Sequence, residues 1–316
     1  MRLLRLYLRN FRNYERLELS LEPETAITVL YGPNAAGKTN LLEAIYFLAT
    51  ATSHRAQRLQ ELIRWGSDGF FIKAQLTRRQ RLITLELRLD HHGRRGLRIN
   101  GAAKQSLADL YGCLNVVLFS PEDLQLVKGA PAVRRRFLDS QFSQIHPGYQ
   151  SLLVEYRQAL LQRNRLLKQL TAKQHMNDLL AVWNEQLVHY GSRLIHRRLI
   201  ALQPLAARLQ AEHQRLAGSE EPLRLEYRCS VIGEPLPLTA AASVPTQEEL
   251  TVRFRDRLRQ RRQEELARGY TLVGPHRDDL SFQLGGKEAR LFASQGQQRT
   301  IVLALKLAVL EWMEAE

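Results

Sequence analysis

The chain has 316 residues, of which 44% are hydrophobic and 25% charged, and its two cysteines, Cys113 and Cys229, lie far apart without metal or disulfide spacing. No apolar run approaches the ~18 residues of a membrane span, and the first ten residues lack the apolar core of a signal peptide, so we expect a cytoplasmic protein. The net charge of +14 favours a polyanionic partner, either nucleic acid or an acidic membrane surface, although a solvated arginine-rich surface explains it equally well.

The amino-terminal part of the sequence has the patterns of strands around one helix. Residues 3–31 are predicted to form strands, and the apolar run 26–31 predicts a buried strand that ends at Gly32. Residues 40–51 have helical spacing. Residues 70–76 and 81–89 predict two antiparallel strands followed by a turn at 91–96, and residues 114–120 predict another buried strand.

The middle of the chain is predicted to be helical. Residues 149–216 contain two amphipathic helices joined by a polar turn, which indicates a helical hairpin or short coiled coil whose stripe is a packing surface. In the first helix the stripe is interrupted by Arg163, and Asn177 or Asp178 is expected to cap the second helix. A basic helix follows at 253–269, with charges around its whole circumference. The apolar stripe consists of Leu153, Tyr156, Leu160, Leu167, Leu170, Leu180, Trp183, Leu187, Tyr190 and Leu194.

A phosphate-binding loop lies between the predicted strand at 26–31 and the helix at 40–51. It fits the pattern G-x-x-x-x-G-K-[ST] in the strand–loop–helix context that the motif requires. The glycines let backbone N–H groups point at phosphate oxygens, Lys38 is expected to reach the β and γ phosphates, and Thr39 to ligate Mg²⁺. The sequence therefore predicts ATP or GTP binding by Gly32, Pro33, Asn34, Ala35, Ala36, Gly37, Lys38 and Thr39.

A second anion site is predicted near the end of the chain, where Ser294, Gln295 and Gly296 open a helix. We expect its apolar residues Ile301, Leu305, Ala308 and Leu310 to face a core. This stretch resembles the signature motif of ABC-type ATPases, in which the signature of one subunit closes over the ATP held by the P-loop of the other. The long interval between Lys38 and Ser294 is typical of SMC-type heads that are split by a helical insertion.

Four further stretches, taken together, resemble the RecF family of recombination mediators over essentially the whole chain. They are NFRNY at 10–14, GPNAAGKTN at 32–40, SPEDLQLVKGAPAVRRRFLDSQF at 120–142 and GPHRDDL at 274–280. The resemblance implies an α/β P-loop NTPase with an ABC/SMC-like head and an inserted, coiled-coil-like α-helical lobe. It divides the chain into an ATPase lobe at 1–120, a mainly helical lobe at 121–268 and a return to the ATPase head at 269–316.

The same resemblance implies a function in DNA repair, replication and the SOS response. Such a protein forms a homodimer when ATP and Mg²⁺ are bound, clamps duplex DNA at single-strand gaps, and with RecO and RecR assists the loading of RecA. Single-stranded DNA is a further possible ligand, whereas no membrane partner is expected.

The resemblance also implies roles for residues outside the two anion sites. Arg12 and Asn13 are expected near the nucleotide, although polar residues of a plain turn fit the same positions. The arginines at 134–136 are expected to contact DNA phosphate or to brace a lobe interface, with Asp139 paired to one of them. His276, Asp278 and Asp279 superficially suggest a metal site, but a structural role is favoured because no further ligands are evident. The run of arginines consists of Arg134, Arg135 and Arg136.

One part of the family pattern is missing from the sequence. A Walker B strand with its catalytic acid is expected after the signature helix, but the 316 residues end within that helix, and the stretch 85–90 alternates with polar residues unlike a buried central strand. We therefore expect a truncated or non-hydrolysing product, with an exposed apolar edge beside the P-loop strand that makes it poorly soluble or unstable.

Three other functions compete with an ATP-dependent DNA clamp. A transporter nucleotide-binding subunit shares both motifs but places its signature sooner, and a small-molecule kinase explains only the P-loop. A non-hydrolysing interaction protein that uses ATP as an adhesive fits the missing Walker B strand. The sequence leaves the catalytic residues unidentified.

Overall fold

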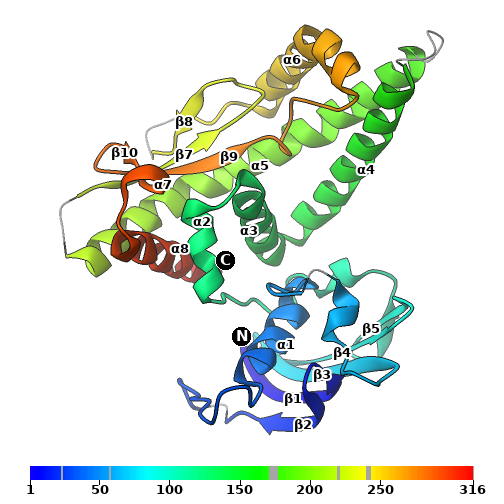
Figure 1. Cartoon of the computed structure of the whole chain (residues 1–316), viewed down its shortest axis with the longest axis vertical. Coiled ribbons are helices and arrows are strands. Elements are labelled where there is room, and N and C mark those ends of the chain that lie inside the picture. The colour runs from blue at the N-terminus through cyan, green and yellow to red at the C-terminus, as the bar shows by residue number, and fades with distance from the viewer. Residues whose placement is uncertain (23, 57, 171–176, 219–220, 240–242, 316) are drawn as a thin grey trace. The chain divides into compact units, whose positions relative to one another are not determined.

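The computed structural model describes the chain except residues 23, 57, 171–176, 219–220, 240–242 and 316 (Figure 1). The described residues form two compact units, the first of Met1–Leu118 with Ser143–Pro147 and the second of Phe119–Phe142 with Gly148–Glu316. The break after Leu118 lies beside the lobe boundary expected at 120. Residues 269–316, for which we expected a return to the ATPase head, are grouped with the second unit.

The first unit is built on a six-stranded antiparallel sheet in the order β2-β1-β3-β4-β5-β6. The predicted strands at 70–76 and 81–89 are confirmed as β3 and β4, which pair from Phe70 opposite Leu89 to Leu76 opposite Ile83. The turn at 91–96 leads into β5. The strands are β1 (Arg2–Phe11), β2 (Tyr14–Ser20), β3 (Gly69–Arg78), β4 (Arg81–Asp90), β5 (Arg95–Ile99) and β6 (Ala102–Lys104).

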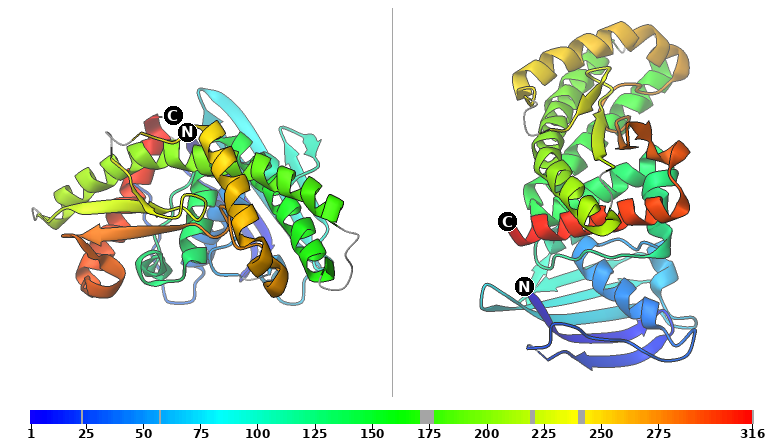
Figure 2. Two further views of the ribbon diagram at one scale, coloured as in Figure 1. Left: turned by 90° about the horizontal axis from the view of Figure 1, so that it is seen from above. Right: turned by 90° about the vertical axis from the view of Figure 1, so that its left-hand side faces the viewer.

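The predicted helix at 40–51 is confirmed as α1 (Lys38–Thr50), which covers one face of this sheet (Figure 2). Alternate strand residues such as Leu8 and Ile72 point at the helix and are fully buried, whereas their neighbours face solvent. Phe47 of α1 packs edge-on against Phe70 of β3, with ring centroids 5.9 Å apart. Short 3-10 helices η1 (Leu59–Leu62) and η2 (Leu107–Leu110) close the core.

Two strand predictions in this unit are wrong. Residues 26–31 form no strand, and the side chains of Ile27, Val29 and Tyr31 are 77%, 74% and 93% exposed. Among the described residues no strand pairs with this segment, and of its large apolar side chains Leu30 packs against the core. The segment 114–120 is also outside the sheets, because side chains bind its backbone: Val116 N donates to Gln144 Oε1 at 2.7 Å.

The second unit combines long helices with a small antiparallel sheet in the order β10-β9-β7-β8. Its strands are β7 (Leu223–Arg228), β8 (Pro235–Pro237), β9 (Asp279–Leu284) and β10 (Lys287–Glu288). Its helices are η3 (Pro121–Leu124), α2 (Gln125–Lys128), α3 (Pro131–Ile145), α4 (Pro147–Leu170), α5 (Asn177–Ala217), α6 (Gln247–Arg268), α7 (Ala289–Phe292) and α8 (Gln295–Ala315). Residues 143–147, at the end of α3 and the start of α4, are grouped with the first unit.

The predicted helices at 149–216 and 253–269 are confirmed as α4, α5 and α6. Arg163 interrupts the apolar stripe of α4 but not its packing, since only 1% of its side chain is exposed. Its guanidinium donates to Asn184 of α5 at 2.7 Å, Thr271 at 2.7 Å and Glu265 of α6 at 2.6 Å. Arg163 thus joins α4 to α6 through a buried ion pair and to α5 through a hydrogen bond, where the pattern showed only a defect. The cap expected at Asn177 or Asp178 concerns the start of α5, and the residues just before it lie outside the described part of the chain.

Helix α8 packs across α5 (Figure 2), in keeping with the place of residues 269–316 in the second unit. Ile301, Leu305 and Ala308 are buried as predicted. Leu310 was expected in the same core but is 42% exposed, because nine helical residues after Ile301 place it on the opposite side of the helix. No described helix is long and apolar enough to cross a bilayer.

Candidate functional site

The phosphate loop predicted at 32–39 leads from the exposed segment 26–31 into α1. Three of its residues adopt positive φ: Gly32 at 146°, Ala35 at 65° and Gly37 at 102°. Lys38 folds back, and its Nζ donates to the carbonyl oxygens of Gly32 and Pro33 at 2.7 Å each. The ammonium group is therefore held over the loop that it closes, which brings Gly32 and Lys38 together as the motif requires.

The start of α1 suits an anion. Gly37 occupies the cap position and offers no side-chain acceptor to the first N–H groups of the helix, and no acidic residue lies in the first turn. Thr39 is exposed at this end of the helix. Free amide donors, a lysine and a threonine hydroxyl are the groups that hold a nucleotide phosphate and its metal ion, so the residues present fit ATP and Mg²⁺.

The turn between β1 and β2 lies against the loop. Asn13 Nδ2 donates to Ala36 O at 3.3 Å, and Asn40 Nδ2 donates to Asn13 Oδ1 at 2.8 Å. A Cβ atom added at Gly37 would lie 2.6 Å from Asn13 Nδ2, so only glycine fits this contact at its positive φ. Asn13 thus lies beside the phosphate loop.

Arg12 has a different partner in the same turn. It makes a bidentate ion pair with Glu43 of α1, from Nε at 2.9 Å and Nη2 at 2.8 Å, and Nη1 donates to Glu61 O at 3.0 Å. Burial alone would raise the pKa of Glu43, but hydrogen bonds from Arg12 and Ser53 outweigh it, so the pKa is lowered and the carboxylate stays ionised. Arg12 therefore fastens the turn to α1.

One cation near the loop was missed in the sequence. Arg55 is exposed, and its Nη1 donates to Asn40 Oδ1 at 3.0 Å, which links it through Asn40 to Asn13 and the loop. No motif in the sequence marks it, because its position depends on how the chain folds back after α1.

The predicted signature opens α8. Ser294 N donates to Gln297 Oε1 at 2.8 Å and Gln297 N donates to Ser294 Oγ at 3.2 Å, which is a reciprocal capping box. Since Ser294 Oγ accepts in this pair, its hydroxyl hydrogen is left to donate to an anion. Ser294, Gln295 and Gly296 are all exposed at the positive end of this 21-residue helix.

The arginines at 134–136 have three different surroundings. Arg134 is buried and pairs with Asp279 through Nε at 2.7 Å and Nη2 at 2.8 Å, so it braces the second unit. Arg135 is half-buried, with Nη1 donating to Asp278 O at 2.7 Å, and Arg136 is exposed.

Asp139 was expected to pair with one of these arginines, and the structure shows an ion pair with Arg198 of α5. Asp139 receives hydrogen bonds from Arg198 Nη2 at 2.7 Å and the Tyr149 hydroxyl at 2.6 Å. A carboxylate this deeply buried needs charged and polar donors within the core, and α4 and α5 bring them.

The residues that superficially suggested a metal site have structural roles. His276 Nδ1 lies 2.6 Å from the Tyr156 hydroxyl, and Asp278 is buried and accepts from Ser230 N and Oγ at 2.8 Å each. Asp279 is neutralised by Arg134. Within the described residues no group of three or more His, Cys, Asp or Glu side chains could hold a metal ion.

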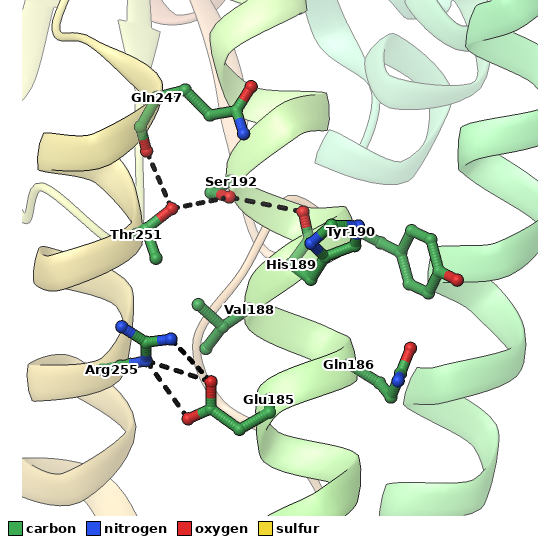
Figure 3. A pocket seen from close by; sticks show the side chains of 9 residues that line it. All are labelled: Glu185, Gln186, Val188, His189, Tyr190, Ser192, Gln247, Thr251 and Arg255. Carbon is green, nitrogen blue, oxygen red and sulfur yellow. Dashed lines mark hydrogen bonds and ion pairs between the residues drawn. The ribbon is translucent and has the colours of Figure 1, made fainter.

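A pocket of about 370 Å³ lies between α5 and α6 (Figure 3). Its polar side chains bind one another: Thr251 Oγ1 donates to Ser192 Oγ at 3.1 Å, and Arg255 Nη2 donates to Glu185 Oε2 at 2.7 Å. They serve to join the two helices, so this pocket is not a candidate catalytic site.

Comparison with known proteins decides the family. The family model described as the RecF/RecN/SMC N terminal domain matches residues 2–315. The DNA replication and repair protein RecF of Natranaerobius thermophilus is 42% identical over the whole of this chain and 81% of its own length. The chain belongs to the RecF family. The RecF protein of Symbiobacterium thermophilum is 47% identical, over 97% of this chain and 78% of its own length.

A solved structure shows the RecF fold as well. The structure of the recombination mediator protein RecF-ATP in the RecFOR pathway superimposes with a TM-score of 0.91 at 31% identity, over 99% of this chain and 81% of that one. The fold is therefore that of a P-loop ATPase head of the RecF and SMC type with mixed sheets and helices, as the sequence predicted.

Proposed function

We propose that this chain binds Mg-ATP at the loop 32–39 and forms an ATP-dependent homodimer that clamps duplex DNA at single-strand gaps. The observation that carries the proposal is the loop itself: Lys38 is held over it, Gly37 is fitted to Asn13, and α1 begins without a side-chain cap. The RecF relative that was solved as RecF-ATP supports the choice of nucleotide.

The exposed Ser294 hydroxyl supports the dimer. In the proposed assembly, Ser294, Gln295 and Gly296 of one subunit hold the γ-phosphate bound by Lys38 of the other, with Thr39 on Mg²⁺. The net charge of +14 supports DNA binding through the phosphate backbone, which is sensitive to salt and largely indifferent to sequence. By analogy with the RecFOR pathway named for the solved relative, RecR and RecO are the proposed protein partners, in support of RecA loading, replication and the SOS response.

A second candidate function is an ATP-binding interaction protein that does not hydrolyse its nucleotide. The loop 32–39 contains no acid, and Glu43, the first acid after it, is held by Arg12 and is completely buried, so it is unsuited to activate water. Phosphate release measured with Mg-ATP and gapped DNA separates the two candidates, since release at background level favours the second.

The test of the dimer uses two variants that are each defective alone. Lys38→Ala removes the phosphate lysine, and Ser294→Asp keeps the helix cap but repels phosphate. We expect neither to dimerise or retain DNA with Mg-ATP, whereas an equal mixture regains one complete site and partial dimerisation in size analysis. Lys104→Ala, at an exposed lysine of β6, is the matched control. Failure of the mixture to recover would contradict the shared site.

A further inference from the structure

A second cationic site lies in the second unit, on elements that carry neither the loop nor the signature. A cavity of about 240 Å³ is lined by side chains of α3, α4 and α5 and of the segment that precedes β9. We call it the arginine pocket and define it by Ala132, Arg135, Arg136, Arg157 and Arg198, with Asp139 as the one acid in its lining.

The floor of the arginine pocket is held rigidly. Arg198 is 1% exposed, and it donates to the Tyr149 hydroxyl at 2.9 Å, to Pro275 O at 2.8 Å and to Asp139 at 2.7 Å. Asp139 neutralises its charge. Because all of these hydrogen bonds join Arg198 to buried groups, its guanidinium forms a fixed floor of the pocket and does not move to meet a ligand.

The arginines at the mouth are in surplus over acids. Arg136 is exposed and has no hydrogen bond or ion pair within the described part of the chain. Arg157 is 60% exposed, and its contact to Asp139 Oδ2 is long at 3.5 Å. Arg135 is half-buried, and burial, followed by the nearby charge of Arg198, lowers its pKa against the attraction of Asp279, Asp278 and Asp139. Asp279, the acid that acts most strongly on Arg135, also pairs with Arg134, so its charge is shared between two arginines.

The cationic surface continues from the pocket along α4. Arg157, Arg165 and Lys168 are all exposed and follow one another at eight and three residues, which places them on one face of the helix over about 17 Å. Glu155, the exposed acid of this stretch, lies about 200° around the helix from Arg157. Such a row suits an extended polyanion, whereas a single small phosphate needs only the pocket.

We propose that the arginine pocket holds a backbone phosphate of a nucleic-acid strand, which then runs along the α4 row. Guanidinium forks bind phosphate oxygens in pairs, and Ala132 brings the positive end of α3 to the same cavity. The inference rests on the proposed DNA binding and names the residues that hold the strand.

Two kinds of variant test the pocket. Arg136→Gln and Arg157→Gln remove exposed charges, and we expect each to lower affinity for a 30-base-pair duplex about 5- to 10-fold and to reduce the salt slope by about 1. Ala132→Asp places a negative charge in the cavity at a helix start that favours acids, so it is expected to lower DNA affinity similarly without lowering the melting temperature. Arg215→Gln, which removes an arginine paired with Glu212 on α5, is the matched control and is expected to stay within twofold of the unaltered chain.

Each outcome has a defined meaning. Duplex affinity within twofold of the unaltered chain for the Arg136→Gln, Arg157→Gln double variant overturns the proposal. If inorganic pyrophosphate or polyglutamate binds and is lost in Ala132→Asp while DNA affinity is unchanged, the pocket serves another anion and the proposal is also overturned. Binding of a fluorescent ATP analogue is expected to be normal in all three variants, and loss of DNA binding by Lys38→Ala alone would test the clamp separately from the pocket.

Discussion

The buried ion pair between Arg163 and Glu265 gives the sharpest test of how the second unit is held together. Their side chains are 1% and 0% exposed, and Glu265 also accepts from Leu272 N at 2.7 Å. Replacement of Arg163 by methionine keeps the apolar stem but leaves the carboxylate without its counter-ion. Removing one partner of a buried pair costs about 3–5 kcal/mol, so we expect Arg163→Met to lower the free energy of unfolding by that amount.

A double variant separates the ion pair from the volume of the side chain. Glu265→Gln keeps an acceptor for Leu272 N but carries no charge, so Arg163→Met combined with Glu265→Gln is expected to recover about 2 kcal/mol or more of the loss. Arg165→Met, two residues away and exposed, is the matched control and is expected to change stability by less than about 0.5 kcal/mol.

Urea unfolding followed by tryptophan fluorescence is suited to this measurement. Trp183 packs beside the buried leucines of α4 and α5, and Trp312 is buried in α8, so both report on the second unit. Trp65, in the first unit, is 96% exposed and is expected to change little on unfolding. A loss below about 1 kcal/mol for Arg163→Met, or no recovery in the double variant, would refute the reasoning.

Three other predictions follow from the structure. Gly37→Ala puts a Cβ atom against Asn13, so we expect at least a tenfold loss of affinity for a fluorescent ATP analogue, with partial recovery when Asn13→Ala is added; unchanged affinity would contradict the contact. Val29→Lys interrupts the exposed apolar segment 26–31 and is expected to raise the concentration at which aggregation begins, measured by light scattering, whereas an unchanged onset would show that the segment is harmless. Burial lowers the pKa of His276 from 6.5 to about 4. Between these pH values the histidine is protonated in the unfolded chain but neutral in the folded chain, so the free energy of unfolding falls as the pH drops from about 6.5 to 4, by at most about 3 kcal/mol. This loss should be smaller in His276→Gln than in the unaltered chain when both are unfolded in urea across that range, and equal slopes would rule out the histidine as its source.

Local patterns in the sequence were sufficient for the phosphate loop and the long helices. Gly37, Lys38 and Thr39 act within one turn of chain, and the stripes of α4 and α5 repeat within each helix. Composition was not sufficient for residues 26–31. Their apolar run predicts that something covers them, but it carries no information on which segment does so, and none of the described strands pairs with them.

The buried charges were beyond the reach of sequence patterns for a related reason. Arg163 interrupts a stripe, and only the fold shows that Glu265 and Thr271 come from more than 100 residues away to satisfy it. Asp139 was assigned to a neighbouring arginine because charges close in sequence are the visible candidates. In the structure α5 brings Arg198, whose guanidinium is buried and therefore already desolvated, which makes it the better partner for the buried carboxylate of Asp139.

The same network explains why two of the stretches that marked the family need each other. Arg134 and Arg135 come from the stretch 120–142, and they bind Asp279 and the carbonyl of Asp278 in the stretch 274–280. Removing the charge of Arg134 or of Asp279 leaves the other charge buried and unpaired, so the pairing of the two stretches stabilises the second unit. Arg136, adjacent in sequence, is excluded from this network and points its charge outward beside Arg157. Within one run of three arginines, Arg134 is thus buried in the fold and Arg136 is exposed, which is why substitution of Arg136 tests the proposed DNA binding without disturbing the core.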